Sequence, residues 1–166
     1  MAEDLDLMRS LSVTHVLNCC SFSQTVTAAD ELVYKTVQML DIPEYDMRQD
    51  LNEAIEFIDS AQESGGRCLV HCNAGVSRST SLVIGYLILR HGLAYEQAFE
   101  AVSKRLDVNI PSFSAPFEFK VRKSYPKLKP NEGFVRQLKL LTPGPGIMQC
   151  TQPSKKPAGE QREDRS

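Results

Sequence analysis

One short segment of the chain concentrates the side chains that could do chemistry. It lies between two apolar runs and reads His71-Cys72-Asn73-Ala74-Gly75-Val76-Ser77-Arg78-Ser79. A free thiol has a pKa of about 8.5, but a helix N-terminus and a neighbouring Arg can lower it to about 3.5–7.5, which would make Cys72 a thiolate nucleophile. Arg78 presents a planar fork of donors that grips two oxygens of a tetrahedral anion. The pattern predicts attack by sulfur on a bound phosphate.

The residues between Cys72 and Arg78 are small or medium in size, so their backbone N–H groups can turn inward around one anion. Gly75 gives that turn its freedom. Ser79, at the start of the next helix, can cap that helix and donate a hydrogen bond to the Cys72 sulfur as it leaves. His71 is expected to orient the loop through backbone hydrogen bonds rather than to transfer protons. The residues expected to bind the phosphate are Asn73, Ala74, Gly75, Val76, Ser77 and Arg78.

An α/β order of elements surrounds this segment. β-branched and alternating apolar residues predict strands over residues 13–18 and 34–40, and the second strand places Asp41 at its carboxyl end. Residues 68–70 form a short buried strand that leads into the segment, and an apolar helix over residues 79–90 follows it. A single cysteine at a strand end is commonly an inert buried thiol. The full string in register between a strand and a helix is far more specific.

Helical periodicity and end signals predict the remaining helices. The best defined covers residues 51–61, with Asp50 as its N-cap, Glu53 as the capping-box partner and Gly65-Gly66 as its stop. The last helix begins at Asn131. Further helices are expected over residues 5–11 and 94–104, and the buried face of the last helix is expected to carry Phe134, Val135, Leu138 and Leu141.

Five blocks along the chain carry a family resemblance. They are Thr14-His-Val-Leu-Asn18, Leu40-Asp-Ile-Pro-Glu44, Glu53-Ala-Ile-Glu-Phe-Ile-Asp59, Val70-His-Cys-Asn-Ala-Gly-Val-Ser-Arg-Ser79 and Lys129-Pro-Asn-Glu-Gly-Phe134. In this order they resemble the dual-specificity protein phosphatases, and most of all the small atypical members. These belong to the protein-tyrosine-phosphatase superfamily, whose signature is His-Cys-x5-Arg-Ser. The resemblance implies the cysteine-phosphatase fold, with a central, mostly parallel sheet flanked by helices.

The resemblance also assigns a reaction and roles. It implies hydrolysis of phosphotyrosine and of phosphoserine or phosphothreonine in proteins, through a phosphocysteine intermediate on Cys72. Arg78 would bind phosphate, Ser79 would assist breakdown of the intermediate, and Asn131 would help to brace the loop. Phosphorylated proteins are the expected partners, with members of the mitogen-activated protein kinase pathway as candidates.

A carboxyl group must protonate the leaving oxygen, and it must lie on a loop that faces the thiolate. Chemistry alone allows Asp41, Asp46 or Asp50. The resemblance favours Asp41, because it precedes Cys72 by the separation that is usual in the family. Asp46 is the alternative, whereas Asp50 is expected to serve as a helix cap. The expected catalytic residues are therefore Cys72, Asp41, Arg78 and Ser79.

Two departures from the family pattern leave a rival hypothesis open. The chain starts inside the usual first helix, which predicts loss of an edge strand, and it carries an insertion over about residues 103–121 that is interpreted as a long loop. We expect one catalytic domain over residues 1–141 and a disordered tail over residues 142–166. The rival is a catalytically weak scaffold that binds kinases or phosphoproteins. A sulfur-transfer enzyme is disfavoured, because Ser79 and Asp41 would have no role in it.

Charge and cysteine content limit the expected classes of binding partner and the expected cellular compartment. A formal net charge of −2 and a pI near 5.9 give no basic excess for binding nucleic acid or a membrane surface. The five cysteines are odd in number and lack Cys-x-x-Cys spacing, which favours a reducing compartment, cytoplasmic or also nuclear. Cys68 and Cys72 should lie about 13 Å apart on one strand, too far for a disulfide. For Cys19 and Cys20 two interpretations stay open: an approach to Cys72 in the fold, or, as favoured here, buried thiols near a strand end.

The site itself is expected to be self-sufficient. No metal or cofactor is required, because Arg78 and the loop amides supply the positive field. The loop positions Asn73, Ala74 and Val76 lack the Lys or His that would suit a heavily phosphorylated lipid head group. A protein phosphate is therefore the expected substrate, and a monomer is the expected state.

Overall fold

A parallel sheet forms the base of the molecule. The computed structural model describes residues 6, 8–20, 32–73, 76–104 and 128–142. In these residues three strands pair in the order β2-β1-β3, and both pairs are parallel. The strands are β1 (Val13–Asn18), β2 (Val33–Thr36) and β3 (Arg67–His71). The α/β fold with a parallel sheet, expected from the sequence, is confirmed.

The central strand β1 sets the register of the sheet. Leu17 lies opposite Lys35 of β2 and Val70 of β3, and Asn18 lies opposite His71. Leu17 is completely buried, as expected for the central strand of a parallel sheet. Since β1 and β3 end side by side, the residues that follow them meet at one edge of the sheet.

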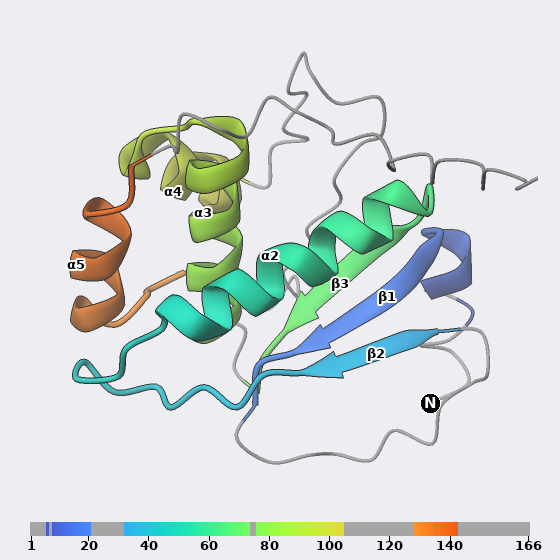
Figure 1. Cartoon of the computed structure of the whole chain (residues 1–166), viewed down its shortest axis with the longest axis horizontal. Helices are drawn as coiled ribbons and strands as arrows, with labels where there is room; N and C mark the ends of the chain where they lie inside the picture. Colours follow the sequence, from blue (N-terminus) through green and yellow to red (C-terminus); the bar gives the residue numbers. More distant parts are fainter. Residues whose placement is uncertain (1–5, 7, 21–31, 74–75, 105–127, 143–166) are drawn as a thin grey trace, which may run out of the picture.

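Helices cover one face of the sheet and its carboxyl edge (Figure 1). Helix α2 (Arg48–Glu63) packs against β1 and β3, whereas α3 (Arg78–His91), α4 (Tyr95–Lys104) and α5 (Glu132–Lys139) gather beyond the carboxyl ends of the strands. A short helical stretch that includes residues 8–10 precedes β1. The carboxyl edge is thus enclosed by helices that begin or end close to it.

Helix α3 lies at the centre of the helical layer. Every residue from Ser79 to Ile88 is buried, because α2, α4, α5 and β3 all pack around it. A helix surrounded on all sides has little reason to be amphipathic, which explains its continuous apolar sequence. This packing fixes the start of α3, and with it the side chains of its first turn.

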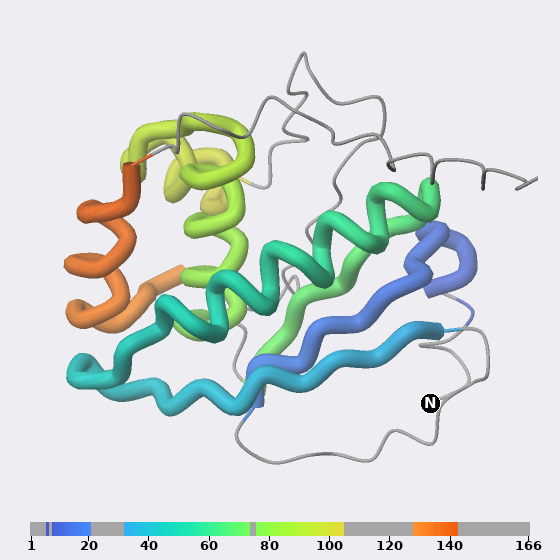
Figure 2. The backbone as a smooth tube through the Cα atoms, viewed as in Figure 1, coloured from blue at the N-terminus to red at the C-terminus, as the bar shows by residue number. Residues whose placement is uncertain are grey.

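The segment between β2 and α2 differs from the expectation. The strand predicted over residues 34–40 ends at Thr36, although the alternation continues with Val37 and Met39 buried and Gln38 exposed. The backbone of residues 37–47 leaves the sheet and runs past the lower end of α5 before α2 begins (Figure 2). Asp41 therefore lies on this crossing segment rather than directly at the end of a strand.

The helix ends correct one prediction and confirm others. Met47 occupies the N-cap position of α2, so Asp50 does not cap it but lies in its first turn, and Glu53 forms an ion pair with Lys35 at 3.3 Å instead of a capping box. Gly65 follows the end of α2 with φ 72°, a conformation that glycine adopts readily. At α5 the Asn131 side chain accepts a hydrogen bond from the Phe134 N–H, as an N-cap does.

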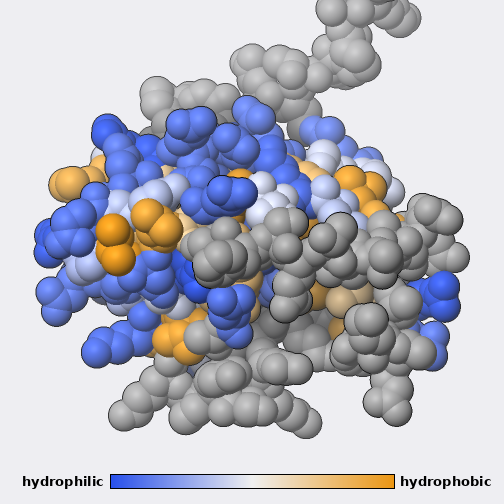
Figure 3. Space-filling model, turned by 90° about the horizontal axis from the view of Figure 1, so that it is seen from below, coloured by the Kyte–Doolittle hydropathy of each residue, from blue (hydrophilic) through white to orange (hydrophobic). Residues whose placement is uncertain are grey.

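The surface of the described region is mainly polar. Figure 3 shows separate apolar patches among hydrophilic side chains on the face seen from below. Among the side chains that the structure describes, the large apolar ones that are exposed are Val33, Leu40, Ile42 and Leu140. Most of the predicted insertion over residues 103–121 and of the predicted tail lies outside the described residues, apart from Ser103 and Lys104 in α4 and Thr142. These two predictions therefore stay predictions.

Candidate active site

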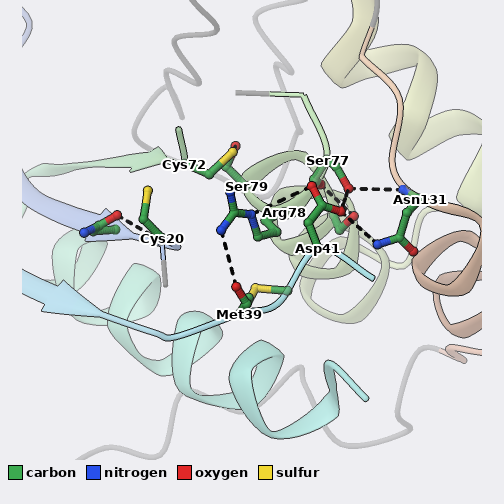
Figure 4. A network of polar contacts seen from close by, with 10 residues as sticks. Cys20, Met39, Asp41, Cys72, Ser77, Arg78, Ser79 and Asn131 are labelled. Carbon is green, nitrogen blue, oxygen red and sulfur yellow. Dashed lines mark hydrogen bonds and ion pairs between the residues drawn. The ribbon is translucent and has the colours of Figure 1, made fainter. Parts of the chain in front are cut away.

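The residues of the predicted loop lie where β3 gives way to α3. Cys72 directly follows β3 and is 8% exposed, and Arg78 is the first residue of α3. The neighbouring strand holds the loop entrance, because the Cys19 N–H donates to the His71 carbonyl at 2.8 Å. Figure 4 shows Cys72, Ser79 and Arg78 together, with Asp41, Ser77 and Asn131 beside them.

A serine hydroxyl contacts the sulfur of Cys72. The distance from Cys72 Sγ to Ser79 Oγ is 3.2 Å, and Ser79 is 1% exposed. The N-cap position of α3 is Ser77 and no side chain caps it, so the expectation that Ser79 caps the helix is wrong. The reason is geometric: Ser79 lies inside the first turn, where its hydroxyl faces the sulfur. The arrangement lets the hydroxyl stabilise negative charge on that sulfur.

The Arg78 guanidinium is nearly buried beside Cys72. Its Nη1 donates to the Met39 carbonyl at 3.3 Å, and its Nε lies 3.9 Å from Asp41 Oδ2. The side chain is only 11% exposed, and Nε has no hydrogen-bond partner among the described residues. The Met39 carbonyl thus fixes the position of the guanidinium through Nη1, and the Nε donor stays available for an anion. Sequence reasoning missed Met39, because a backbone acceptor leaves no signal in side-chain types.

The carboxylate of Asp41 joins three parts of the chain. Its Oδ1 accepts from Ser77 Oγ at 2.6 Å and from Asn131 Nδ2 at 2.9 Å, and its Oδ2 faces Arg78. Asp41 remains 38% exposed at its side chain. The structure therefore brings Asp41, Arg78 and Asn131 together beside the loop, as Figure 4 shows.

The two other aspartates considered from the sequence lie elsewhere. Asp46 is hydrogen-bonded by the Arg48 side chain and backbone, and those contacts lower its pKa to about 2. Asp50 accepts a hydrogen bond from the Tyr45 hydroxyl at 2.9 Å, and burial raises its pKa. The hydrogen-bond partners of these two carboxylates, Arg48 and Tyr45, lie outside the loop that carries Cys72.

The loop after Cys72 is only partly described. Ala74 and Gly75 lie outside the described residues. The Asn73 N–H donates to the Cys20 sulfur, and the Val76 carbonyl accepts from the Lys129 N–H at 3.0 Å. Ser77 is 7% exposed, and its hydroxyl binds Asp41 and accepts from the Asn131 N–H at 3.1 Å. The Ser77 side chain thus links neighbouring segments, a role that its position in the motif did not reveal.

His71 and the remaining cysteines are buried around the site. Burial lowers the pKa of His71, which favours a neutral ring. Burial also raises the pKa of Cys19 well above its usual value, raises that of Cys20, and raises that of Cys68 to about 12. The described cysteines form no disulfide. Cys19 and Cys20 both lie near enough to Cys72 for charge on its sulfur to raise their pKa values.

The described residues hold neither a metal centre nor a membrane-spanning helix. Within those residues, no group of three or more His, Cys, Asp or Glu side chains is placed to hold a metal ion. No helix in the same part of the chain has the length and apolar character that a membrane span requires.

Comparisons with known proteins agree with this geometry. The family model of the dual specificity phosphatase catalytic domain matches residues 1–142. Dual specificity protein phosphatase 1 of Arabidopsis thaliana is 35% identical over 138 residues, which cover 82% of this chain and 59% of that protein. Dual specificity protein phosphatase 19 of Mus musculus is 34% identical over 138 residues, which cover 83% of this chain and 54% of that protein. The chain thus spans little more than half of these relatives.

Solved structures show the same fold. The crystal structure of DUSP15 matches with a TM-score of 0.65 and 29% identity over 83% of this chain and 75% of that one. Human DUSP28 matches with a TM-score of 0.63 and 25% identity over 81% of this chain and 80% of that one. The motif, the parallel sheet and the family match over residues 1–142 agree, and the chain belongs to the dual-specificity phosphatase family.

Proposed function

We propose that this chain is a protein phosphatase that hydrolyses phosphotyrosine and phosphoserine or phosphothreonine through a phosphocysteine intermediate. The observation that carries the proposal is the 3.2 Å contact between Cys72 Sγ and Ser79 Oγ at the start of α3, beside the Arg78 guanidinium. A thiolate there has a hydrogen-bond donor, a helix N-terminus and a cation around it, which are the conditions that favour the ionised thiol.

In the first step the Cys72 thiolate attacks phosphorus and the bond from phosphorus to the leaving oxygen breaks. Arg78 binds phosphoryl oxygens, and its Nε is available as a donor because no group in the described part of the chain accepts a hydrogen bond from it. Asp41 gives its proton to the leaving oxygen. Since Oδ1 already accepts from Ser77 and Asn131, Oδ2 is the oxygen that would carry that proton.

In the second step water attacks the phosphocysteine, the bond from phosphorus to sulfur breaks and inorganic phosphate leaves. Asp41, now ionised, takes the proton from the attacking water. The sulfur departs as a thiolate, and the Ser79 hydroxyl donates a hydrogen bond to it. His71 stays neutral and orients the loop. The loop amides, including those of Ala74 and Gly75, complete the phosphate site in this scheme.

The proposed partners are phosphorylated proteins. Two relatives carry the names dual specificity protein phosphatase MPK-4 and protein-tyrosine-phosphatase MKP1, which is consistent with a substrate in the mitogen-activated protein kinase pathway. We further propose that the protein is a monomer. It would act in the cytoplasm or also in the nucleus, and it would bind neither nucleic acid nor a membrane.

Turnover by the purified chain tests the proposal. We expect release of inorganic phosphate from p-nitrophenyl phosphate and from phosphotyrosyl and phosphothreonyl peptides, and rapid acid quenching followed by mass spectrometry should find a phosphoryl group on Cys72. A chain that binds phosphopeptide without releasing phosphate would contradict the proposal in favour of the scaffold. Phosphate release without a Cys72 adduct would overturn the mechanism alone.

A further inference from the structure

The segment that leads into α5 contacts both halves of the proposed site. We call residues 129–137 the bracket. Its first part holds the loop that carries the nucleophile, because the Lys129 N–H donates to the Val76 carbonyl at 3.0 Å and the Asn131 N–H donates to Ser77 Oγ at 3.1 Å. The bracket is therefore fixed directly to the residues that precede α3.

The same segment also contacts the segment that carries Asp41. Here we call residues 41–47 the acid loop. The Asn131 amide donates to Asp41 at 2.9 Å. Gly133 packs so closely on the acid loop that an added Cβ would lie 1.8 Å from the Pro43 carbonyl oxygen. Glycine is required at this position because backbone of the acid loop occupies the space of a side chain.

Gln137 makes the third connection. Its Oε1 accepts from the Met47 N–H at 2.9 Å, and its Nε2 donates to the Tyr45 carbonyl at 2.7 Å. Gln137 lies one helical turn after Gly133, so both residues lie on one face of α5. A side-chain amide carries a donor and an acceptor together, and both are used here. The acid loop is thus held at Asp41, at Pro43 and again at its end.

Hydrogen bonds within the acid loop connect the residues that Gln137 binds to the residues next to Asp41. The Tyr45 N–H donates to the Ile42 carbonyl at 3.2 Å, and the Tyr45 hydroxyl lies 3.2 Å from the Gln38 carbonyl and 2.9 Å from Asp50, which share its one proton. The turn therefore connects the residue that Gln137 binds to the neighbour of Asp41. Figure 2 shows the backbone of this region running past the lower end of α5.

We propose that Gly133 and Gln137 are positioning residues for acid catalysis, which set the distance from the Asp41 carboxyl group to the leaving oxygen. The inference rests on the proposed function and extends it to a helix that contributes no reacting group. A proton donor must lie within about 2.6–3.2 Å of its acceptor. A displacement of about 1 Å by a remote change can cost on the order of 10²-fold in rate.

Kinetics on two substrates separates positioning from general damage. Gln137→Ala removes both contacts to the acid loop, whereas Gln137→Glu keeps an acceptor for the Met47 N–H and loses the donor to the Tyr45 carbonyl. For phenyl phosphate, a poor leaving group, we expect kcat/KM to fall about 10- to 100-fold in Gln137→Ala and less in Gln137→Glu. For p-nitrophenyl phosphate, which needs little protonation, the change should stay within about threefold.

The matched control is Arg136→Ala, an exposed neighbour on the same helix. It should leave both substrates unchanged. Gly133→Ala, which forces a Cβ against the Pro43 carbonyl, should reproduce the pattern of Gln137→Ala, and thermal unfolding shows whether it folds. The inference is wrong if Gln137→Ala lowers kcat/KM equally on both substrates, or on neither.

Amide hydrogen exchange keeps the test independent of turnover. In Gln137→Ala, the amides of Ile42 and of residues 44–47 should exchange faster, while those of residues 78–88 in α3 should not change. Unchanged exchange in the acid loop would overturn the inference even in an inactive chain. An inactive wild-type chain whose acid loop is released by Gln137→Ala would contradict the proposed function but leave the positional role intact.

Discussion

The two ends of β3 place the same side chain in two different surroundings. Cys68 lies within the strand, 3% exposed, and burial raises its pKa to about 12. Cys72 follows the strand, 8% exposed, with the Ser79 hydroxyl at 3.2 Å and Arg78 at the start of the next helix. Burial alone therefore makes an inert thiol, whereas nearby donors and a cation create the conditions for a nucleophile.

The same contrast separates two arginines of α3. Arg90, at the far end, forms an ion pair with the Asp59 carboxylate at 2.6 Å, which offsets its charge. Arg78 lies 3.9 Å from Asp41, which is also bound by Ser77 and Asn131. Within the described residues, neither arginine Nε makes a hydrogen bond, so that feature alone does not mark a site. The position at the carboxyl edge of the sheet, beside Cys72, distinguishes Arg78.

The largest expected effect comes from exchanging the two cysteines. Cys72→Ser should lower turnover by at least about 10⁴-fold, because a hydroxyl cannot be activated by surroundings that suit a thiolate. Binding of phosphopeptide should be preserved. Cys68→Ser is the matched control and should retain turnover. Phosphate release assays and phosphopeptide binding check both variants, and near-normal turnover in Cys72→Ser would remove this sulfur from the mechanism.

Exchanging the arginines should give the next largest effect. Arg78→Lys replaces a fork by a point charge, and loss of a positioned donor to a phosphoryl oxygen costs on the order of 10²–10³-fold in kcat/KM. Arg90→Lys can still pair with Asp59 and should change kcat/KM little. Steady-state kinetics on p-nitrophenyl phosphate compares the pair. Equal losses in both variants would show that Arg78 acts only on the packing of α3.

Much of the fold around Cys72 could be predicted from local sequence. The strand over residues 13–18 matches β1, and the strand, loop and helix around Cys72 were expected because turn residues, apolar runs and the motif occur together. The predicted start of α2 was wrong, since Asp50 and Glu53 resemble a capping box but contact residues that precede the helix, Tyr45 and Lys35, instead. Contacts of that kind depend on the packed fold and leave no local pattern.

The links between distant segments could not be predicted. The Asp41 carboxylate meets Ser77 and Asn131, which are far apart in the sequence, and Gln137 binds backbone atoms of the acid loop. The family resemblance pointed to Asn131, but backbone acceptors carry no side-chain signal, so Gln137 went unnoticed. The roles of Cys72, Asp41, Arg78 and Ser79 remain predictions that the variants test.

Two aspartates of the acid loop sharpen the comparison further. Asp41→Asn should lower kcat/KM for phenyl phosphate by about 10²-fold and for p-nitrophenyl phosphate much less, because only the poor leaving group needs a proton. It should also remove the basic limb of the pH profile, which reports loss of the acid's proton. Asp46→Asn should change neither, because contacts from Arg48 lower the pKa of Asp46 to about 2 and keep it ionised.

That pair of variants also decides between the two carboxylates. Parallel pH profiles of kcat/KM for Asp41→Asn and Asp46→Asn on both substrates provide the measurement. If Asp46→Asn abolished the basic limb and Asp41→Asn did not, the assignment from family spacing would be wrong. If neither did so in an active enzyme, the acid would come from another part of the chain, and Asp107, outside the described residues, would be the next to test.

Two serines give the smallest expected effect. Ser79 Oγ lies 3.2 Å from the Cys72 sulfur, whereas Ser60 Oγ donates to the Phe57 carbonyl on the surface of α2. A hydrogen bond to a charged group contributes about 1.5–3 kcal/mol, so Ser79→Ala should slow release of the thiolate from the intermediate about 10- to 100-fold. Formation of the intermediate should change less, so p-nitrophenol should appear in a burst of about one equivalent per enzyme before a slow steady state. Ser60→Ala should show no burst. A uniform slowing without a burst in Ser79→Ala would mean that the hydroxyl assists attack by the sulfur rather than its departure.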